Sequence, residues 1–184
     1  MGSRRSAYPL PAGRRIGVVA LSLLAFAIVL PGSALAGDVR NMQILDRCDP
    51  ASFNAAFGDG TCILRNGGVP LEQFLRRVNP KDGGHSAWRF SPGDARLTDG
   101  QSLRLNNRGG ETHTFTEVVD FGGGFVEPLN ATLPPGTPLA VPIGDLRFIE
   151  AGQKIDLAAL PVGTHRFECL IHPWMQTTVQ QTSK

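Results

Sequence analysis

The chain lacks the short sequence patterns that mark several common enzyme classes. It contains no G-x-S-x-G pattern, so nothing in it favours a serine hydrolase of the α/β type. Its one run of three glycines, Gly122–Gly124, is not followed by the Lys and the Ser or Thr of a phosphate-binding loop. These absences leave no sequence support for nucleophilic hydrolysis or for phosphate chemistry.

Basic runs are also missing beyond the first residues of the chain. Four of the 18 Lys and Arg residues, and none of the 16 Asp and Glu residues, lie within residues 1–36, so the formal charge of +2 becomes −2 for residues 37–184. No stripe of alternating basic and aromatic residues remains. The sequence therefore predicts no nucleic-acid partner.

Residues 1–36 have the pattern of a cleaved signal peptide. Two Arg-Arg pairs precede an apolar run over residues 16–30, and the small residues Ser33–Ala36 offer a cleavage site before Gly37. The apolar run is short for a bilayer, so we predict no membrane span in the mature chain and a periplasmic or secreted location. The context of the Arg pairs favours the general secretory route and leaves twin-arginine export open.

Cysteine is scarce, with 3 residues, and an odd number is informative in an exported chain. Cys48 and Cys62 lie close enough in sequence to pair, and their disulfide would stabilise the fold by about 3 kcal/mol. Cys169 is left over. An unpaired thiol is vulnerable in an oxidising compartment unless it holds a metal.

Cys169 begins a short segment that is rich in metal-binding side chains. Cys169, His172 and Met175 form the pattern C-x2-H-x2-M, which composition alone predicts roughly 0.001 times in such a chain. A thiolate, two imidazoles and a distant thioether are the ligands of a blue-copper site, and His113 can supply the second imidazole. The simpler alternative is a buried Cys near a surface His and a core Met.

Residues 37–84 differ in pattern from the rest of the mature chain. Asp49 and Pro50 have the types preferred at a helix N-cap and first turn, and the apolar spacing from Val69 to Val78 predicts a second helix. We predict a small helical extension, held by a Cys48–Cys62 disulfide, whose apolar face packs on the core.

Residues 85–184 have the pattern of an all-β domain. Apolar and polar residues alternate in short runs that Gly, Pro, Asn and Asp separate, which favours a β-sandwich or barrel. Between Asp120 and Gly144 lies a Gly- and Pro-rich stretch, and a connection of that length is usually functional or mobile.

Three segments carry a resemblance to a known family: Trp88–Pro92, Leu105–His113 and Gly163–Cys169. Together with the metal-binding pattern, they make residues 86–181 similar to the cupredoxins, the small blue-copper proteins related to plastocyanin. The spacing of His172 and Met175, with Pro173 after the His, most resembles the amicyanin type.

The resemblance implies a Greek-key β-sandwich with one type 1 copper ion at one end. It implies that the ligands are His113, Cys169, His172 and Met175. In this family the second His usually reaches the surface within an apolar patch, through which electrons pass. Trp174 fits either such a patch or the core.

The chain departs from the family at several positions. Ile171 stands where the family often has Pro, and we hypothesise that its N–H donates a second hydrogen bond to the Cys169 sulfur. Thr114 replaces a common Asn, and whether its hydroxyl ties the ligand loops together is left open. His165 is interpreted as a hydrogen-bonded core residue, and His85 as a solvated loop residue, with a second metal site there left open.

The resulting hypothesis is an exported carrier of single electrons, a monomer that meets redox partner proteins transiently. It is not predicted to be an enzyme. The chain has no His-x-His pair, which a multicopper oxidase needs, and it is short for a copper nitrite reductase with its second copper site. Two alternatives stay open: a protein that stores or delivers copper, and a cupredoxin-fold binding module.

Overall fold

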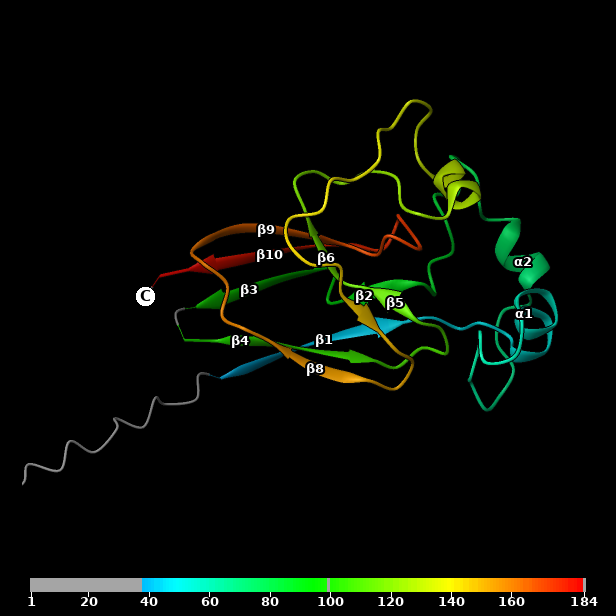
Figure 1. The fold of residues 1–184 in the computed structure, drawn as a ribbon, viewed down its shortest axis with the longest axis horizontal. Helices are drawn as coiled ribbons and strands as arrows, with labels where there is room; N and C mark the ends of the chain where they lie inside the picture. The colour runs from blue at the N-terminus through cyan, green and yellow to red at the C-terminus, as the bar shows by residue number, and fades with distance from the viewer. Residues whose placement is uncertain (1–37, 99, 184) are drawn as a thin grey trace, which may run out of the picture. The chain divides into compact units, whose positions relative to one another are not determined.

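The alternating strands build two sheets that pack against each other (Figure 1). The computed structural model describes residues 38–98 and 100–183, and the predicted signal peptide, residues 1–36, lies outside them. One sheet has the order β2-β1-β4-β8 and the other the order β3-β10-β9-β6. A separate pair joins β5 to β7. The strands are β1 Val39–Leu45, β2 Arg89–Ser91, β3 Asp94–Thr98, β4 Ser102–Asn107, β5 His113–Thr114, β6 Thr116–Val118, β7 Phe148–Ile149, β8 Lys154–Leu157, β9 Gly163–Glu168 and β10 Gln176–Thr182.

Both sheets are mixed. In the first, β1 pairs antiparallel with β2 and parallel with β4. In the second, β10 pairs parallel with β3 and antiparallel with β9. Every second residue of β4 and of most of β10 is buried, because alternate side chains of a strand point to opposite faces. The predicted all-β class, a sandwich with a small helical extension, is confirmed.

The core between the sheets is aromatic at its centre. The rings of Phe115 and Phe167 stack at 4.4 Å, and Phe90 meets Phe115 edge to face at 5.1 Å. Such pairs add roughly 0.5–1.5 kcal/mol each beyond the area that they bury. Aliphatic side chains from both sheets complete the core, among them Met42, Ile44, Leu97, Leu103, Leu105 and Val179.

The extension is helical only in part. Residues 39–45, which we assigned to it, form β1, a central strand of the first sheet. Only Met42 and Ile44 of this strand are fully buried, and its polar remainder hides the strand pattern in the sequence.

The two short helices follow β1, and the first of them lies inside the loop that the predicted disulfide closes. Helix α1 (Pro50–Phe57) begins at Asp49, whose carboxylate accepts the N–H of Ser52 at 2.9 Å. Helix α2 (Leu71–Leu75) is shorter than predicted and buries Phe74. Cys48 and Cys62 form the predicted disulfide. None of the helices in the described part of the chain has the length and apolar character of a membrane span.

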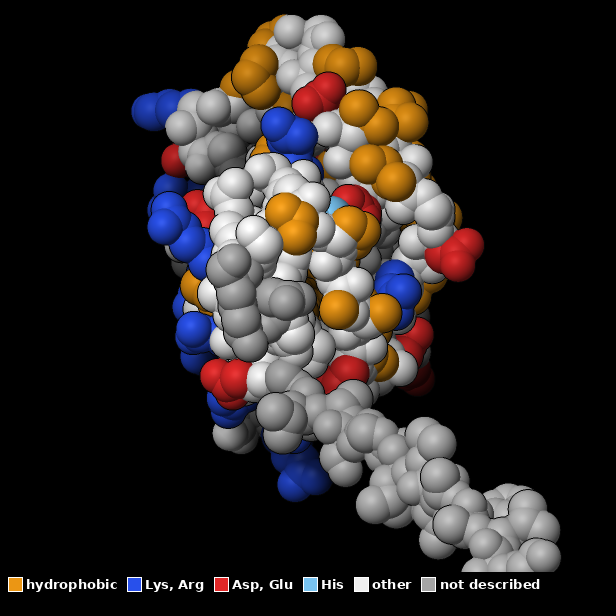
Figure 2. All heavy atoms as spheres, turned by 90° about the vertical axis from the view of Figure 1, so that its left-hand side faces the viewer, with side chains coloured by type: hydrophobic (Ala, Val, Ile, Leu, Met, Phe, Trp, Pro, Cys, Tyr) orange, Lys and Arg blue, Asp and Glu red, His pale blue; other side chains and the backbone are white. Residues whose placement is uncertain are grey.

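The helices lie at the end of the sandwich where β9 connects to β10 (Figure 1). The connection from β6 to β7 is as long as predicted and contains one 3-10 helix, η1 (Glu127–Thr132). Figure 2 views the opposite end of the sandwich, where hydrophobic side chains gather at the top, over this connection. Its exposed hydrophobic residues include Phe125, Leu139, Val141 and Ile143.

Candidate metal centre

The Cys169–Met175 segment is a closed loop between two paired strands. β9 ends at Glu168 and β10 begins at Gln176, and these two residues are opposite each other in the sheet. The N–H of Cys169 donates to the carbonyl of Met175 at 3.0 Å, and the N–H of Met175 donates to the carbonyl of His172 at 2.8 Å. The strand pairing therefore fixes where the loop's side chains lie.

Three of the four predicted ligand residues meet at this end of the sandwich. The Cys169 sulfur is 3.7 Å from Nδ1 of His113 and 3.9 Å from Nδ1 of His172. His113 comes from β5, whereas the other two come from the loop. All three are buried, and one donor atom of each lies within 4.8 Å of the others. These are the residue types and the closeness that a metal centre needs.

The distances between the donor atoms suit a metal ion. An ion about 2.3 Å from a thiolate sulfur and about 2.0 Å from an imidazole nitrogen, at a trigonal angle, holds those atoms roughly 3.8 Å apart. The two sulfur–nitrogen distances of 3.7 and 3.9 Å match this spacing. The donor set, one thiolate with two imidazoles, is the one that copper prefers in a trigonal site.

Met175, the fourth predicted ligand, is 1% exposed. Its backbone hydrogen bonds to Cys169 and His172 hold it on the same loop. Its sulfur is a weak, soft donor of the kind that occupies a distant axial position. Met175 thus stays a predicted ligand on a loop that carries two others.

Thr114 ties the two ligand segments together. Its N–H donates to the Cys169 sulfur at 3.4 Å, and its hydroxyl accepts the N–H of Leu170 at 2.7 Å. The hydrogen bond proposed from the N–H of Ile171 to the same sulfur is absent among the described residues, so that hypothesis is wrong. In this chain the sulfur receives its backbone hydrogen bond from the β5 side of the site.

Two buried carboxylates stand behind the histidines, and the sequence alone did not identify them. Asp46 Oδ2 lies 2.9 Å from Nε2 of His113, and Glu111 Oε2 lies 3.9 Å from Nε2 of His172. The indole N–H of Trp88 also donates to Glu111. Glu111 precedes His113 by two residues, so its position in the sequence places it near the site. The sequence gives no such indication for Asp46, because Asp46 reaches the site only through the pairing of β1 and β4.

The charges of the site favour a thiolate. Burial opposes the ionised thiol, but hydrogen bonds and charge from His113 and His172 hold the pKa of Cys169 well below its usual range. Burial likewise opposes the charged form of His113, yet its hydrogen bonds to Asp46 and Cys169 raise the pKa of His113 to about 10. The sulfur is therefore already the form that binds a metal.

His172 does not reach the surface, contrary to what the resemblance implies. It is 3% exposed, and an aromatic cluster covers it: Phe74 of α2, Trp88 and Trp174 have ring centroids 6.1, 6.4 and 5.4 Å from its ring. Trp174 is half-buried against Gly84, where a Cβ atom would lie 2.3 Å from the indole. The extension, which has no counterpart in the resemblance, supplies Phe74 and this glycine.

An apolar cavity of about 410 Å³ lies beside the covered histidine. Its walls come from the two helices and from the η1 region, and His172 and Glu111 line it as well. At its rim Phe57 and Leu75 are 63% and 50% exposed. His172 therefore lines this cavity, although it is only 3% exposed.

The two remaining histidines lie outside the site. His165 forms hydrogen bonds with Glu117 Oε1 at 2.7 Å and with the carbonyl of Pro161 at 2.8 Å, as predicted. It is half-buried, however, and is not the core residue that we predict from the sequence. His85 is half-buried, and its Nδ1 accepts the N–H of Ala87 at 3.1 Å. In residues 38–98 and 100–183, no metal-binding cluster includes either of them.

Glu168, next to Cys169, provides a prediction about pH. It is fully buried, and burial together with the nearby thiolate charge raises the pKa of Glu168 from 4.5 to about 8, although the N–H of Gly122 donates to its Oε2 at 3.0 Å. An unfolded chain loses this proton near pH 4.5, so the folded chain holds one more proton up to pH 8. The unfolding free energy of the copper-free protein should therefore fall as pH rises through this window.

The matched variant is Glu168→Gln, which removes the charge and keeps the shape. The difference between the two pH profiles should reach a few kcal/mol, with about 1.4 kcal/mol per pKa unit as the upper bound. Urea unfolding of both proteins at several pH values between 5 and 8 measures this difference. Parallel profiles for the two proteins would contradict the raised pKa of Glu168.

Comparisons with known proteins give structural neighbours of low sequence identity. No family model matches the chain, and no curated protein matches it in sequence. A purple cupredoxin from Nitrosopumilus maritimus has 11% identity and a TM-score of 0.40, over 77% of this chain and 98% of its own. A variant of amicyanin in the Cu(I) state has 16% identity and a TM-score of 0.34, over 50% of this chain and 72% of its own.

A second amicyanin variant, in its reduced state, has 17% identity and a TM-score of 0.35 over the same shares of the two chains. All three neighbours are of the kind that the sequence resembles. Because the identities and TM-scores are low, we base the function on the geometry of the site.

Proposed function

We propose that this protein is a mononuclear type 1 copper protein that carries single electrons. One observation carries the proposal: the buried sulfur of Cys169 faces Nδ1 of both His113 and His172 at distances that suit a shared metal ion. We propose these three residues and Met175 as the ligands. When bound, copper supplies a one-electron couple between its Cu(II) and Cu(I) states.

The chain's own residues keep the site rigid. The hydroxyl and N–H of Thr114 fix the loop and the sulfur from the β5 side, and the β9–β10 pairing fixes the loop's two ends. Asp46 accepts a hydrogen bond from Nε2 of His113, and Glu111 lies 3.9 Å from Nε2 of His172. A frame that holds its ligands still while the charge of the ion changes favours rapid electron exchange.

The burial of the ligands distinguishes this proposal from copper storage or delivery. Cys169 is 0% exposed, and His113, His172 and Met175 are 0%, 3% and 1% exposed. A protein that hands copper over needs ligands that a partner can reach, whereas an electron carrier needs a closed site. We therefore favour the carrier. We expect its redox partner to dock transiently over the cavity rim near Phe57 and Leu75.

A copper titration tests the proposal. Adding Cu(II) to residues 37–184 should produce an intense blue thiolate-to-copper absorption that saturates at one ion per chain, because Cys169 is bound as thiolate. The colour should disappear with a reductant and return with an oxidant over repeated cycles. A colourless product, or colour that does not return, would contradict the proposed function.

An excess of a Cu(I) chelator separates the two copper functions. The buried site should release copper slowly, over a time much longer than that of electron exchange. Loss of copper as fast as the chelator is mixed in would favour delivery instead.

A further inference from the structure

Asp46 is a carboxylate in an unusual place. It follows β1, its side chain is 0% exposed, and all its recorded partners are hydrogen-bond donors. Oδ1 accepts the N–H groups of Cys48 at 3.2 Å and Gly110 at 2.9 Å. Oδ2 accepts the N–H of Glu111 at 3.1 Å and lies 2.9 Å from Nε2 of His113. A buried carboxylate is stable only when its oxygens are satisfied in this way.

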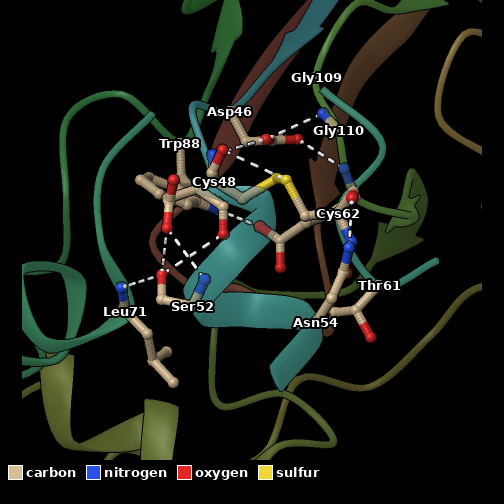
Figure 3. Close-up of a disulfide and its surroundings, with 12 residues drawn as sticks. Asp46, Cys48, Ser52, Asn54, Thr61, Cys62, Leu71, Trp88, Gly109 and Gly110 are labelled. Atoms are coloured by element: carbon tan, nitrogen blue, oxygen red, sulfur yellow. Dashed lines mark hydrogen bonds between the residues drawn. A yellow bond between two sulfur atoms is a disulfide. The ribbon is translucent and has the colours of Figure 1, made fainter. Parts of the chain in front are cut away.

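One glycine makes room for this carboxylate, and the next makes room for the neighbouring disulfide. A Cβ atom on Gly109 would lie 1.8 Å from Oδ2 of Asp46, and one on Gly110 would lie 2.6 Å from the sulfur of Cys48. Figure 3 shows the Asp46 carboxylate beside the disulfide and these glycines. The close approach of three chain segments thus depends on the absence of side chains at positions 109 and 110.

Asp46, Glu111 and His113 also have the composition of a second metal site, since one donor atom from each lies within 4.8 Å of the others. The hydrogen bonds argue against a cation there. Three backbone N–H groups already point at the Asp46 oxygens, and a cation would meet their positive ends. The carboxylate serves the histidine instead.

We propose that Asp46 is the positioning residue of His113, and this inference rests on the proposed copper site. Nε2–H donates to Asp46, so Nδ1 is the nitrogen that faces Cys169. When a metal ion displaces the proton on Nδ1, the lone pair of this nitrogen is directed at the ion that it shares with the sulfur. The negative carboxylate behind the ring makes the imidazole a stronger donor. It therefore stabilises the more highly charged Cu(II) over Cu(I) and lowers the reduction potential.

The variant Asp46→Asn keeps the shape of the side chain and removes its charge. Its Cu(II) affinity should fall by about 10–100-fold, and its reduction potential should move to a more positive value. The matched control is Asp49→Asn, which changes another aspartate beside the same disulfide. Asp49 caps α1 through Ser52, and because asparagine is as good a cap, this control should leave both the stability and the potential nearly unchanged. Equal potentials for wild type, Asp46→Asn and Asp49→Asn would overturn the inference.

A measurement on the wild-type protein covers the case in which Asp46→Asn does not fold. In the copper-free protein at neutral pH, NMR should show a His113 Nε2–H proton that exchanges slowly with water, because Asp46 holds it in the interior. Rapid exchange of that proton would overturn the inference. This measurement needs no copper. If the protein failed to bind copper, that result would contradict the proposed function and leave the role of Asp46 to be tested by NMR. A blue protein with an unchanged potential in Asp46→Asn defeats only the role of Asp46.

Discussion

Replacing Cys169 with serine should abolish the blue absorption completely and weaken Cu(II) binding more than any other single substitution in the site. The absorption requires a thiolate, and a serine hydroxyl stays protonated where the thiol ionises. The loss of affinity should exceed the roughly 10–100-fold that removal of a ligand's hydrogen-bond partner costs. Visible spectra and competition with a chelator of known affinity measure the two effects.

The serine variant should still fold. Serine differs from cysteine by one atom, and the loop keeps its backbone hydrogen bonds between Cys169, His172 and Met175. Far-UV circular dichroism checks this. The control is the double variant Cys48→Ser/Cys62→Ser, which removes the disulfide and leaves the three metal-facing donors in place. It should lose about 3 kcal/mol of stability and keep its blue colour. A coloured Cys169→Ser protein would show that copper binds elsewhere in the chain.

The proposed ligand residues could be singled out in the sequence because their pattern is local. Cys169, His172 and Met175 lie on one loop, and His113 lies in a segment whose spacing already resembles a family. The sandwich could be predicted because β4 alternates between half-buried and buried positions, and the first four residues of β9 alternate between half-buried and exposed ones. Local spacing of this kind is visible without knowledge of the tertiary structure.

The surroundings of the site could not be predicted in the same way. Asp46 meets His113 across 67 positions of sequence, and only the register of β1 against β4 brings them together. β1 itself was missed because its buried residues, Met42 and Ile44, stand among polar ones. The cover over His172 depends on how α2 packs, which the apolar spacing of a short helix does not specify.

The variant Phe74→Ala should open the site and destabilise the fold. Phe74 is 3% exposed, and its ring lies 4.6 Å from Trp88, 5.6 Å from Phe53 and 6.1 Å from His172. Truncation of such a side chain costs about 3–5 kcal/mol. It also removes one wall of the cavity of about 410 Å³ that His172 lines, so small molecules should reach His172 more easily.

Two measurements check the opening of the site in the copper-loaded protein. Urea unfolding measures the loss of stability. Titration with azide or imidazole measures whether small molecules reach the metal, because a new ligand at the metal changes the blue absorption. Wild type should exclude both compounds, and Phe74→Ala should take them up. Phe74→Leu, which keeps most of the side chain's volume, should behave nearly as wild type.

The matched control is Phe57→Ala, on the same extension and in the same cavity. Phe57 is 63% exposed and pairs with the ring of Phe53, so its truncation should cost little stability and leave His172 covered. If azide changed the absorption of wild type and of both alanine variants alike, Phe74 would not be the cover of His172. If only Phe74→Ala responds, the extension controls access to the metal centre. Its packing would then explain why His172 is enclosed in this chain, whereas the resemblance to the cupredoxins implies a second His that reaches the surface.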